Sequence, residues 1–389
     1  MHQLTIRNHL AQRNQATIFT DKLLPLSQTF VLEQTRHVKN WEARLVGLES
    51  ISNGIDLSGI DARVMYRETS KNLQRFNAAL YKLTRKDFFA EDVFRETDII
   101  HAHFAPNGSL MVPVAEKLNV PLITTFHGYD ILTNKSAISL RKDLNHAMFA
   151  RRDDELKEKG NLFIVVSDFL KQRALELGYP ESRIKQHYIG VDVDSYAAHC
   201  EPEFREPNTV IFVGRLVEKK GVKYLLEAFK TVSEKNPLAK LKIIGNGPMI
   251  KLVEAAVNAN AGRIEYLGSK NHEQVLRAVN RSAILCVPSC TAADGNSETF
   301  GMVFAEAMAL GIPVVSSWHG GIPEVVKNDV TGLLAKERDS AELAECLLGL
   351  LSDSNAREKM GIAGKERVSN LFDIRKQSKS LESIYASFT

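Results

Sequence analysis

The sequence predicts an α/β protein built from two doubly wound parallel-sheet domains that face each other across a cleft. Its 389 residues exceed one ordinary hydrophobic core and fit two domains of common size. Short β-branched apolar runs alternate with longer segments of helical spacing, which indicates βαβ units and parallel sheets. A polar, proline-containing stretch at residues 200–208 interrupts this alternation, and the pattern then restarts. We expect the linker between the domains there.

The first domain is expected at residues 16–200. Its predicted strands are residues 16–20, 98–101, 121–126 and 162–167, and residues 108–118 and 168–177 have helical spacing. The run LFIVVS lacks polar alternation, which is typical of a strand covered on both faces. Residues 1–15 are polar and lack the apolar core of a signal peptide, so we treat them as an N-terminal extension.

The second domain is expected at residues 201–372. Its predicted strands are residues 209–213, 241–244, 264–267, 283–287 and 313–316, again alternating with helices. Ligands of doubly wound sheets bind beyond the carboxyl ends of the strands, so two such domains create a binding cleft at their junction. Residues 373–389 form one more helical pattern, which we expect to cross back onto the first domain.

Composition excludes several classes of protein. The chain is 44% hydrophobic and 25% charged, and 50 Lys and Arg against 47 Asp and Glu leave a formal charge of +3. A nucleic-acid binder would show a dominant basic face, so no nucleic-acid partner is expected. The cysteines (Cys200, Cys286, Cys290 and Cys346) form no CxxC pair, which favours reduced thiols and a cytoplasmic location. No apolar run is long enough to span a bilayer.

Residues 67–87 combine basic side chains with apolar ones at helical spacing. This pattern fits an amphipathic helix whose polar face is solvated. It also fits a helix that meets the anionic headgroups of a membrane surface, so peripheral attachment stays open.

The segment SETFGMVFAEAMALGIPVV, residues 297–315, carries Glu298 and Glu306 on either side of a strand-to-helix turn at Gly301. A small residue in that turn allows backbone N–H groups to approach a ligand, and the helix dipole favours phosphate. Glu298 precedes the helix, and Glu306 follows two turns along it, where it suits a ribose diol. On spacing alone, an amphipathic helix with two incidental glutamates explains the segment equally well.

The segment VGRLVEKKG, residues 213–221, places Arg215 and Lys220 in a loop after a strand. Two cations at the mouth of a parallel sheet suit a diphosphate, because Arg offers a fork of donors and Lys a point charge. Ordinary surface charges are the alternative, and the position after a strand weakens it.

Together these segments resemble the retaining glycosyltransferases of family four, which have the GT-B fold and use nucleoside-diphosphate sugars. Further stretches fall in the family's order: HAHFAPNGS (101–109), TTFHGYD (124–130), VSDFLKQ (166–172), IGVDVDSY (189–196), IIGNGP (243–248) and HGGIPEVV (319–326). The opening DKLLPLSQTFVLEQ (21–34) is similar to transferases that build exopolysaccharide and other cell-surface glycans. The resemblance runs from about residue 16 to the C-terminus.

The resemblance implies a role for each matched residue. Glu298 and Glu306 form the E-x(7)-E signature, in which the first glutamate contacts the donor sugar and the second holds the nucleotide ribose. Arg215 and Lys220 match the pair that binds the diphosphate and supports its departure. The remaining implied residues are Phe300, Gly301, Met302 and Val303 in the donor loop, His127 near the donor sugar across the cleft, and Gly268 with the residues after it beside the nucleobase. The implied catalytic set is Glu298, His127, Arg215 and Lys220.

Some positions depart from the family pattern. The Gly-Gly loop that many members place after the first strand is replaced by residues 25–29, where Ser27 suits a helix cap or an acceptor contact. Thr299 stands where members of the family frequently have Gly, and Asn246 stands where they frequently have Asp. His103 and Asp130 are further candidates for the acceptor side, although histidines of this kind, like His101, are more often structural.

For the reaction, the resemblance implies retention without an enzymic nucleophile, and the sequence offers no obvious carboxylate pair of the glycosidase kind. We expect front-face substitution in which a phosphate oxygen takes the acceptor proton, with no metal and no other cofactor. A UDP or GDP sugar is the expected donor, and a glycan or lipid-linked oligosaccharide at the inner membrane face the expected acceptor.

Three alternatives remain. A nucleotide-sugar epimerase and a nucleotide-sugar-binding subunit without catalysis share the fold. A dehydrogenase has only the incomplete glycine motif at residues 245–250 to support it.

Overall fold

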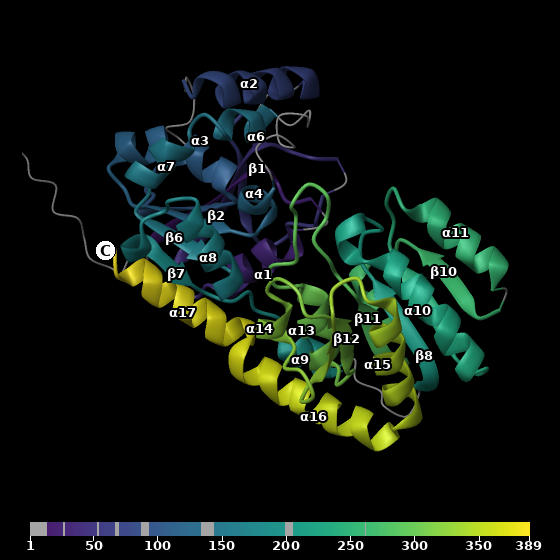
Figure 1. Cartoon of the computed structure of the whole chain (residues 1–389). Helices are drawn as coiled ribbons and strands as arrows, with labels where there is room; N and C mark the ends of the chain where they lie inside the picture. Colours follow the sequence, from purple (N-terminus) through teal and green to yellow (C-terminus); the bar gives the residue numbers. More distant parts are fainter. Residues whose placement is uncertain are drawn as a thin grey trace, which may run out of the picture.

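The computed structural model of the chain describes residues 14–25, 28–52, 54–66, 70–86, 93–133, 144–198, 205–260 and 262–389. Two parallel sheets, each flanked by helices, lie side by side (Figure 1). The predicted fold class is confirmed. Within the described residues, no helix combines the length and apolar character needed to cross a membrane.

The first sheet has seven strands in the order β3-β2-β1-β4-β5-β6-β7, and every neighbouring pair is parallel. Its strands are β1 Gln15–Lys22, β2 Glu42–Glu49, β3 Asp61–Val64, β4 Ile99–His103, β5 Leu122–Phe126, β6 Leu162–Val165 and β7 Ile184–Gln186. The strand order reverses between β1 and β4, which is the switch point where such sheets bind ligands.

The helices of this domain cover both faces of the sheet. They are α1 Thr29–His37, α2 Lys71–Thr84, α3 Ala105–Leu118, α4 Tyr129–Leu132, α6 Leu144–Phe149, α7 Asp153–Lys159 and α8 Asp168–Glu176. The next helix, α9 Val193–Ala198, packs against α13, Met302–Ala309, in the second domain (Figure 1). Successive side chains of a strand point to opposite faces, so β1 contributes Ile18 to one hydrophobic cluster and Phe19 to another. This double burial is why the central strands read as continuous apolar runs.

The second sheet has six strands in the order β10-β9-β8-β11-β12-β13, also parallel throughout. Its strands are β8 Glu206–Val213, β9 Lys240–Ile244, β10 Ile264–Gly268, β11 Ser282–Val287, β12 Val314–Ser317 and β13 Gly332–Ala335. Its helices are α10 Val222–Lys235, α11 Ile250–Ala259, α12 His272–Asn280, α13 Met302–Ala309, α14 Ile322–Val325, α15 Ser340–Ser352 and α16 Ser354–Leu371.

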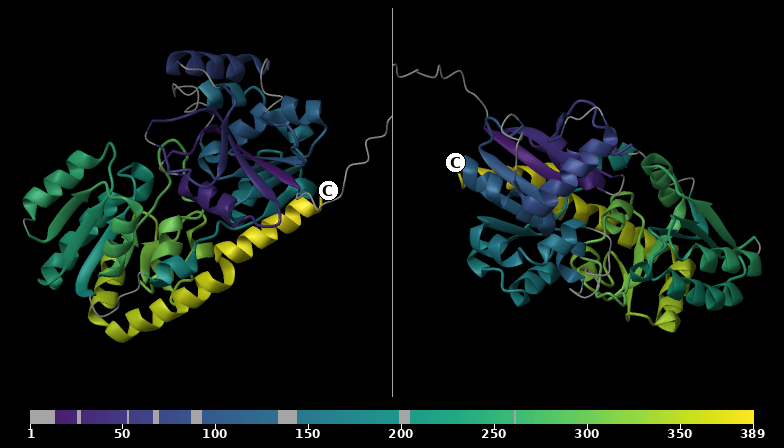
Figure 2. Two further views of the ribbon diagram at one scale, coloured as in Figure 1. Left: turned by 180° about the vertical axis from the view of Figure 1, so that it is seen from behind. Right: turned by 90° about the horizontal axis from the view of Figure 1, so that it is seen from above.

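The last helix, α17 Ile374–Ala386, returns to the first domain (Figures 1 and 2). Its Leu381 and Tyr385 join the hydrophobic cluster beneath α1. The carboxylate of Glu382 accepts backbone N–H bonds from Lys39 at 2.5 Å and Asn40 at 2.6 Å, after the end of α1. The chain therefore crosses between the domains twice, at α9 and again at α16–α17.

Four strands were not among the predicted ones: β2, β3, β7 and β13. β2, EARLVGLE, has a short apolar centre containing a glycine, and charged residues flank it. β3 and β7 lie at the edges of their sheet and are only partly buried, so their sequences are polar. Residues 166–167, predicted as strand, lie beyond β6, and the Ser167 hydroxyl caps α8 by accepting the Leu170 N–H.

Candidate active site

A cavity of about 580 Å³ opens where the carboxyl ends of the two sheets meet. Phe30 and His127 line it from the first domain, after β1 and β5. The second domain contributes most of the wall. Of the residues singled out in the sequence, the cavity wall contains His127, Arg215, Lys220, Glu298, Phe300, Gly301, Met302, Val303 and Glu306.

The donor loop depends on Gly301. This residue has φ of 78° directly before α13, and a Cβ there would lie 2.5 Å from the ring of Phe304. A side chain would therefore push the loop away from the helix start. Met302 and Val303, the first residues of α13, line the cavity. The first N–H groups of a helix have no intrahelical acceptor and carry the positive end of the dipole, so they offer a place for an anion.

Glu298 and Lys220 form an ion pair in the wall of the cavity. Glu298 is only 6% exposed. Burial by itself would raise the pKa of its carboxyl, but Lys220 and Lys219 outweigh burial and lower that pKa to about 2. Glu298 is consequently a carboxylate at neutral pH, able to accept hydrogen bonds and unable to act as a general acid.

The cationic loop after β8 carries three basic residues, of which Arg215 and Lys220 line the cavity. Arg215 is exposed, and Lys220 ends a 3₁₀ turn at Glu218–Lys220. Lys219 points its ammonium group at the Ser297 carbonyl, 3.4 Å away, just before Glu298. Lys219 was not among the residues predicted from the sequence. It is adjacent to Lys220, and sequence spacing does not show which of two adjacent lysines faces Glu298.

Glu306 lies on the second turn of α13 near two residues that the sequence did not indicate. The Tyr196 hydroxyl lies 3.4 Å from its carboxylate and 3.3 Å from Nε2 of His272. Burial raises the pKa of Glu306, and the nearby His272 and the Tyr196 hydrogen bond offset part of that rise. Tyr196 and His272 come from α9 and α12, far apart in the chain, so no local pattern relates them to Glu306.

His127 is half-buried and ends a row of three stacked imidazoles whose other two members, His103 and His101, are buried. Its Nε2 lies 2.9 Å from Nδ1 of His103, and the two rings stack with centroids 5.2 Å apart. The next histidine, His101, lies 2.6 Å from both the Tyr385 hydroxyl on α17 and the Thr125 hydroxyl. Burial lowers the pKa of His103 to about 3, and it lowers the pKa values of His101 and His127 well below their usual range. All three are neutral at pH 7.

The turn that presents His127 is held by Asp130. Its carboxylate accepts the backbone N–H groups of Gly128 at 2.7 Å, Ala105 at 2.9 Å and His127 at 3.1 Å. Asp130 and His103 are both buried and lie behind the cavity wall. Their contact with an acceptor stays a prediction. In the structure, both residues form hydrogen bonds that position His127.

Hydrogen bonds join the two domains beside and beyond the cavity. The Thr299 hydroxyl donates to the His127 carbonyl at 2.8 Å, so the threonine that departs from the family pattern joins the two domains. The Glu324 carboxylate accepts the backbone N–H groups of Asp168 and Phe169, at 2.7 and 2.8 Å, at the start of α8. Both contacts fix the first domain's loops relative to the donor loop.

The predicted nucleobase residue, Gly268, ends β10 and does not itself line the cavity. Ser269 and Lys270, directly after it, do line the cavity wall. The predicted acceptor residue Ser27 lies outside the described residues.

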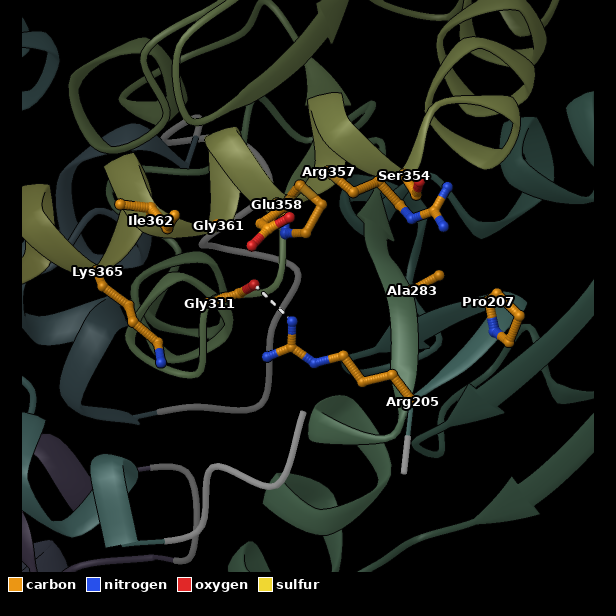
Figure 3. Close-up of a pocket in the computed structure, with 11 residues that line it drawn as sticks. Arg205, Pro207, Ala283, Gly311, Ser354, Arg357, Glu358, Gly361, Ile362 and Lys365 are labelled. Carbon is orange, nitrogen blue, oxygen red and sulfur yellow. Dashed lines mark hydrogen bonds between the residues drawn. The ribbon is translucent and has the colours of Figure 1, made fainter. Parts of the chain in front are cut away.

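A second cavity, of about 350 Å³, lies at the opposite edge of the C-terminal sheet (Figure 3). Arg205 and Pro207 line it at the start of β8, and Pro313 lines it just before β12. Arg205 donates to the Leu310 and Gly311 carbonyls at 2.7 and 3.3 Å. Since ligands of parallel sheets bind at the carboxyl ends of strands, this cavity is not part of the candidate site.

Both halves of the chain match known protein families. Residues 8–195 match Glycosyltransferase Family 4, and residues 200–367 match Glycosyl transferases group 1. The first match begins inside the N-terminal segment that the sequence pattern set apart as an extension.

Among curated proteins, the chain is 30% identical over 292 residues to the putative colanic acid biosynthesis glycosyltransferase WcaL of Escherichia coli (strain K12), covering 74% of this chain and 70% of that protein. It is 29% identical over 280 residues to the amylovoran biosynthesis glycosyltransferase AmsK of Erwinia amylovora, covering 71% and 67%.

Among solved structures, Anabaena Alr3699/HepE in complex with UDP-glucose aligns with a TM-score of 0.74 at 18% identity, covering 96% of this chain and 99% of that one. Sucrose-phosphate synthase from Thermosynechococcus elongatus aligns with a TM-score of 0.73 at 19% identity, covering 96% and 98%. At these identities the likeness shows a shared fold.

Proposed function

Because this chain belongs to the group 1 and family 4 glycosyltransferases, we propose that it moves a hexose-type sugar from a nucleoside-diphosphate sugar to a glycan or lipid-linked oligosaccharide, with retention, in cell-surface or exopolysaccharide synthesis. The relatives named for colanic acid and amylovoran biosynthesis support the pathway class. The UDP-glucose complex of a structural neighbour supports a UDP sugar as the first donor to test, with GDP sugars as the alternative.

One observation carries the donor assignment. Arg215, Lys220 and the N-terminus of α13 converge on one cavity, where they supply positive charge to a diphosphate. Glu306, on the same helix, suits the ribose hydroxyls, and the charged Glu298 suits the hydroxyls of the sugar. A diphosphate between a ribose and a sugar satisfies all of these groups at once.

The charges of the site favour front-face substitution. The acceptor oxygen forms a bond to the anomeric carbon as the bond from that carbon to the diphosphate breaks. The bonding electrons go to the leaving phosphate oxygen, which also takes the acceptor proton. Arg215, Lys220 and the helix dipole stabilise the charge that grows on the diphosphate. Glu298 stays ionised and paired with Lys220, so it orients the sugar and does not protonate the leaving group.

We further propose that no divalent metal is required, since the protein's own cations occupy the role that a metal would have beside the diphosphate. Neutral His127 provides a hydrogen-bonding nitrogen across the cleft from the donor loop. We place the reaction in the cytoplasm, in keeping with the free thiols of Cys286, Cys290 and Cys346.

The first test is a thermal-shift screen against UDP and GDP sugars. A donor at about 100 times its Kd adds about 2.7 kcal/mol of stability. The stabilising donor is then incubated with and without acceptor oligosaccharides, and NMR reads the anomeric configuration of the product. Retention of configuration supports the proposal. An epimerised donor formed without acceptor would instead establish the epimerase alternative, and binding without any turnover would favour the inactive subunit.

Variants of the cationic loop test the leaving-group account separately. Arg215→Ala and Lys220→Ala should each lower the transfer rate about 100-fold or more. Lys223→Ala, an exposed lysine on the next helix, is the matched control. Near-normal rates in both loop variants would refute the role of these cations.

A further inference from the structure

The Tyr196 hydroxyl lies between two residues of the active-site wall. Tyr196 belongs to α9, where the chain crosses to the second domain, and α9 packs against α13 (Figure 1). The hydroxyl lies 3.4 Å from Oε1 of Glu306 on α13 and 3.3 Å from Nε2 of His272 on α12. Glu306 and His272 line the cavity, whereas Tyr196 is only 6% exposed and lies behind them. One buried hydroxyl therefore joins two cavity residues from different helices.

The directions of these two hydrogen bonds follow from the single proton of the hydroxyl. Burial and the neighbouring Glu306 carboxyl group raise the pKa of Tyr196 above its ordinary value of 10.0, so Tyr196 keeps that proton. The O–H donates to Oε1 of Glu306, and the hydroxyl oxygen is left to accept from Nε2 of His272. His272 therefore carries a hydrogen on Nε2.

The hydrogen bond from Tyr196 fixes one end of the Glu306 carboxyl group. Burial raises the pKa of Glu306, and this hydrogen bond opposes the rise, so it favours the carboxylate form. Among the residues that the structure describes, none donates to Oε2, the second carboxyl oxygen. Glu306 thus offers the cavity an acceptor whose orientation is set before a ligand binds, which reduces the side-chain entropy lost on binding.

His272 is also held in place. It is the first residue of α12, directly after the helix cap Asn271. The Asn271 side chain accepts the Gln274 N–H at 2.9 Å, and the Gln274 side chain accepts the Asn271 N–H at 3.2 Å. The His272 ring meets the Tyr196 ring edge-on, with centroids 6.0 Å apart. The capped helix fixes the backbone of His272, and the contact with Tyr196 orients its ring.

We propose that Tyr196 and His272 are positioning residues that make the nucleotide site selective for ribonucleoside diphosphates over their 2′-deoxy forms. His272 orients the Tyr196 hydroxyl, Tyr196 holds Glu306, and Oε2 of Glu306 accepts hydrogen bonds from the ribose diol. A 2′-deoxy nucleotide has lost one of the two hydroxyl donors, and a site built to bond a hydroxyl rejects an analogue that lacks it. The inference rests on the proposed function, because it assigns Glu306 to the ribose of the donor.

The test is calorimetric binding of UDP, GDP and their 2′-deoxy forms to the full chain. The wild type should bind its preferred ribonucleotide at least about 10-fold more tightly than the 2′-deoxy form. Tyr196→Phe should reduce this ratio to about 3-fold or less, because it weakens the ribonucleotide and leaves the 2′-deoxy form nearly unchanged. A merely structural role of Tyr196 would weaken both nucleotides and leave the ratio as it is in the wild type.

His272 variants test the second positioning residue. His272→Gln keeps a side-chain N–H donor and should keep the preference for the ribonucleotide, whereas His272→Leu lacks the donor and should lose it. The matched control is Tyr179→Phe, which removes another buried hydroxyl, one that donates to Asp153 at 2.6 Å in the first domain. Its ratio of affinities should equal that of the wild type.

Two kinds of failure are distinguishable. If the wild type binds neither UDP nor GDP, the donor assignment falls, and the ribose site falls with it. If the wild type binds a ribonucleotide and its 2′-deoxy form equally well, the selectivity is refuted and the donor assignment stands. A wild-type ratio in Tyr196→Phe would likewise overturn the positioning role.

Discussion

Removing the ammonium group of Lys220 should damage stability and catalysis by separable routes. Glu298 is buried beside it, and its pKa lies at about 2 instead of the ordinary 4.5. That lowering corresponds to about 3 kcal/mol in favour of the charged carboxylate. In Lys220→Ala the main partner is gone and burial remains, so we expect the free energy of unfolding to fall by about 3 kcal/mol.

A second substitution separates the two routes. Glu298→Gln in the Lys220→Ala background removes the unpaired buried charge, so stability should return to within about 1 kcal/mol of the wild type. Transfer should not return, because the diphosphate still lacks its cation and the sugar now lacks the carboxylate. We expect the turnover of both Lys220→Ala variants to be at least about 100-fold below the wild type.

Urea unfolding followed by circular dichroism measures the stabilities, and donor turnover measures catalysis, with Lys223→Ala as the control. The pH dependence supplies an independent check. Because the folded pKa of Glu298 is lowered, its contribution to stability is fully present above about pH 4.5 and is lost as pH falls toward 2. Wild-type stability in Lys220→Ala would refute the buried-pair account, and restored turnover in the double variant would refute the leaving-group role.

Three further outcomes are expected. Glu306→Gln should weaken UDP binding about 10-fold, measured by calorimetry, because one of the two carboxyl oxygens that can accept ribose hydrogen bonds becomes an amide nitrogen, and unchanged affinity would contradict the ribose role. Burial lowers the pKa of His103 to about 3, so its contribution to the free energy of unfolding is fully present above about pH 6.5. That contribution decreases as pH falls, because His103 becomes protonated in the unfolded chain and stays neutral in the folded one. When the pH is lowered from 7 to 5, the free energy of unfolding should therefore fall by about 2 kcal/mol less in His103→Asn than in the wild type. Equal decreases in the two proteins, measured by urea titration, would argue against a neutral buried imidazole. Finally, exhaustive EDTA treatment should leave transfer unchanged, and a rate that collapses and returns with Mg²⁺ or Mn²⁺ would show that the protein's cations do not suffice.

The fold class was accessible from the sequence because parallel strands covered on both faces must be continuously apolar. The run LFIVVS therefore predicts β6, and similar apolar runs predict β8 and β11. The missed β3 and β7 lie at sheet edges, where partial burial permits polar residues. The apolar pattern of a strand depends on its burial. An edge strand held mainly by backbone hydrogen bonds therefore lacks this pattern and is not predicted by it.

The donor loop was also accessible, since it is local in sequence. The turn at Gly301, the start of α13 and the spacing of Glu298 and Glu306 all lie within one short segment, and the cavity wall contains them as expected. The cationic loop could be found in the same way, because a parallel sheet places the loop after each strand at its carboxyl edge.

The sequence by itself thus determined the two sheets and the local segments that bear charge at their carboxyl ends. Only the tertiary structure decided which distant residues meet there: Tyr196 with Glu306, Thr299 with His127, and Tyr385 with His101. It also decided that α2 turns Leu73, Phe76, Leu80 and Leu83 to solvent, which periodicity cannot reveal because the same apolar pattern occurs on buried and on exposed helix faces. The same physical reason applies to these three contacts and to the exposed face of α2. Each depends on how two packed elements approach each other, and residues far apart in the chain carry no local signal of that approach.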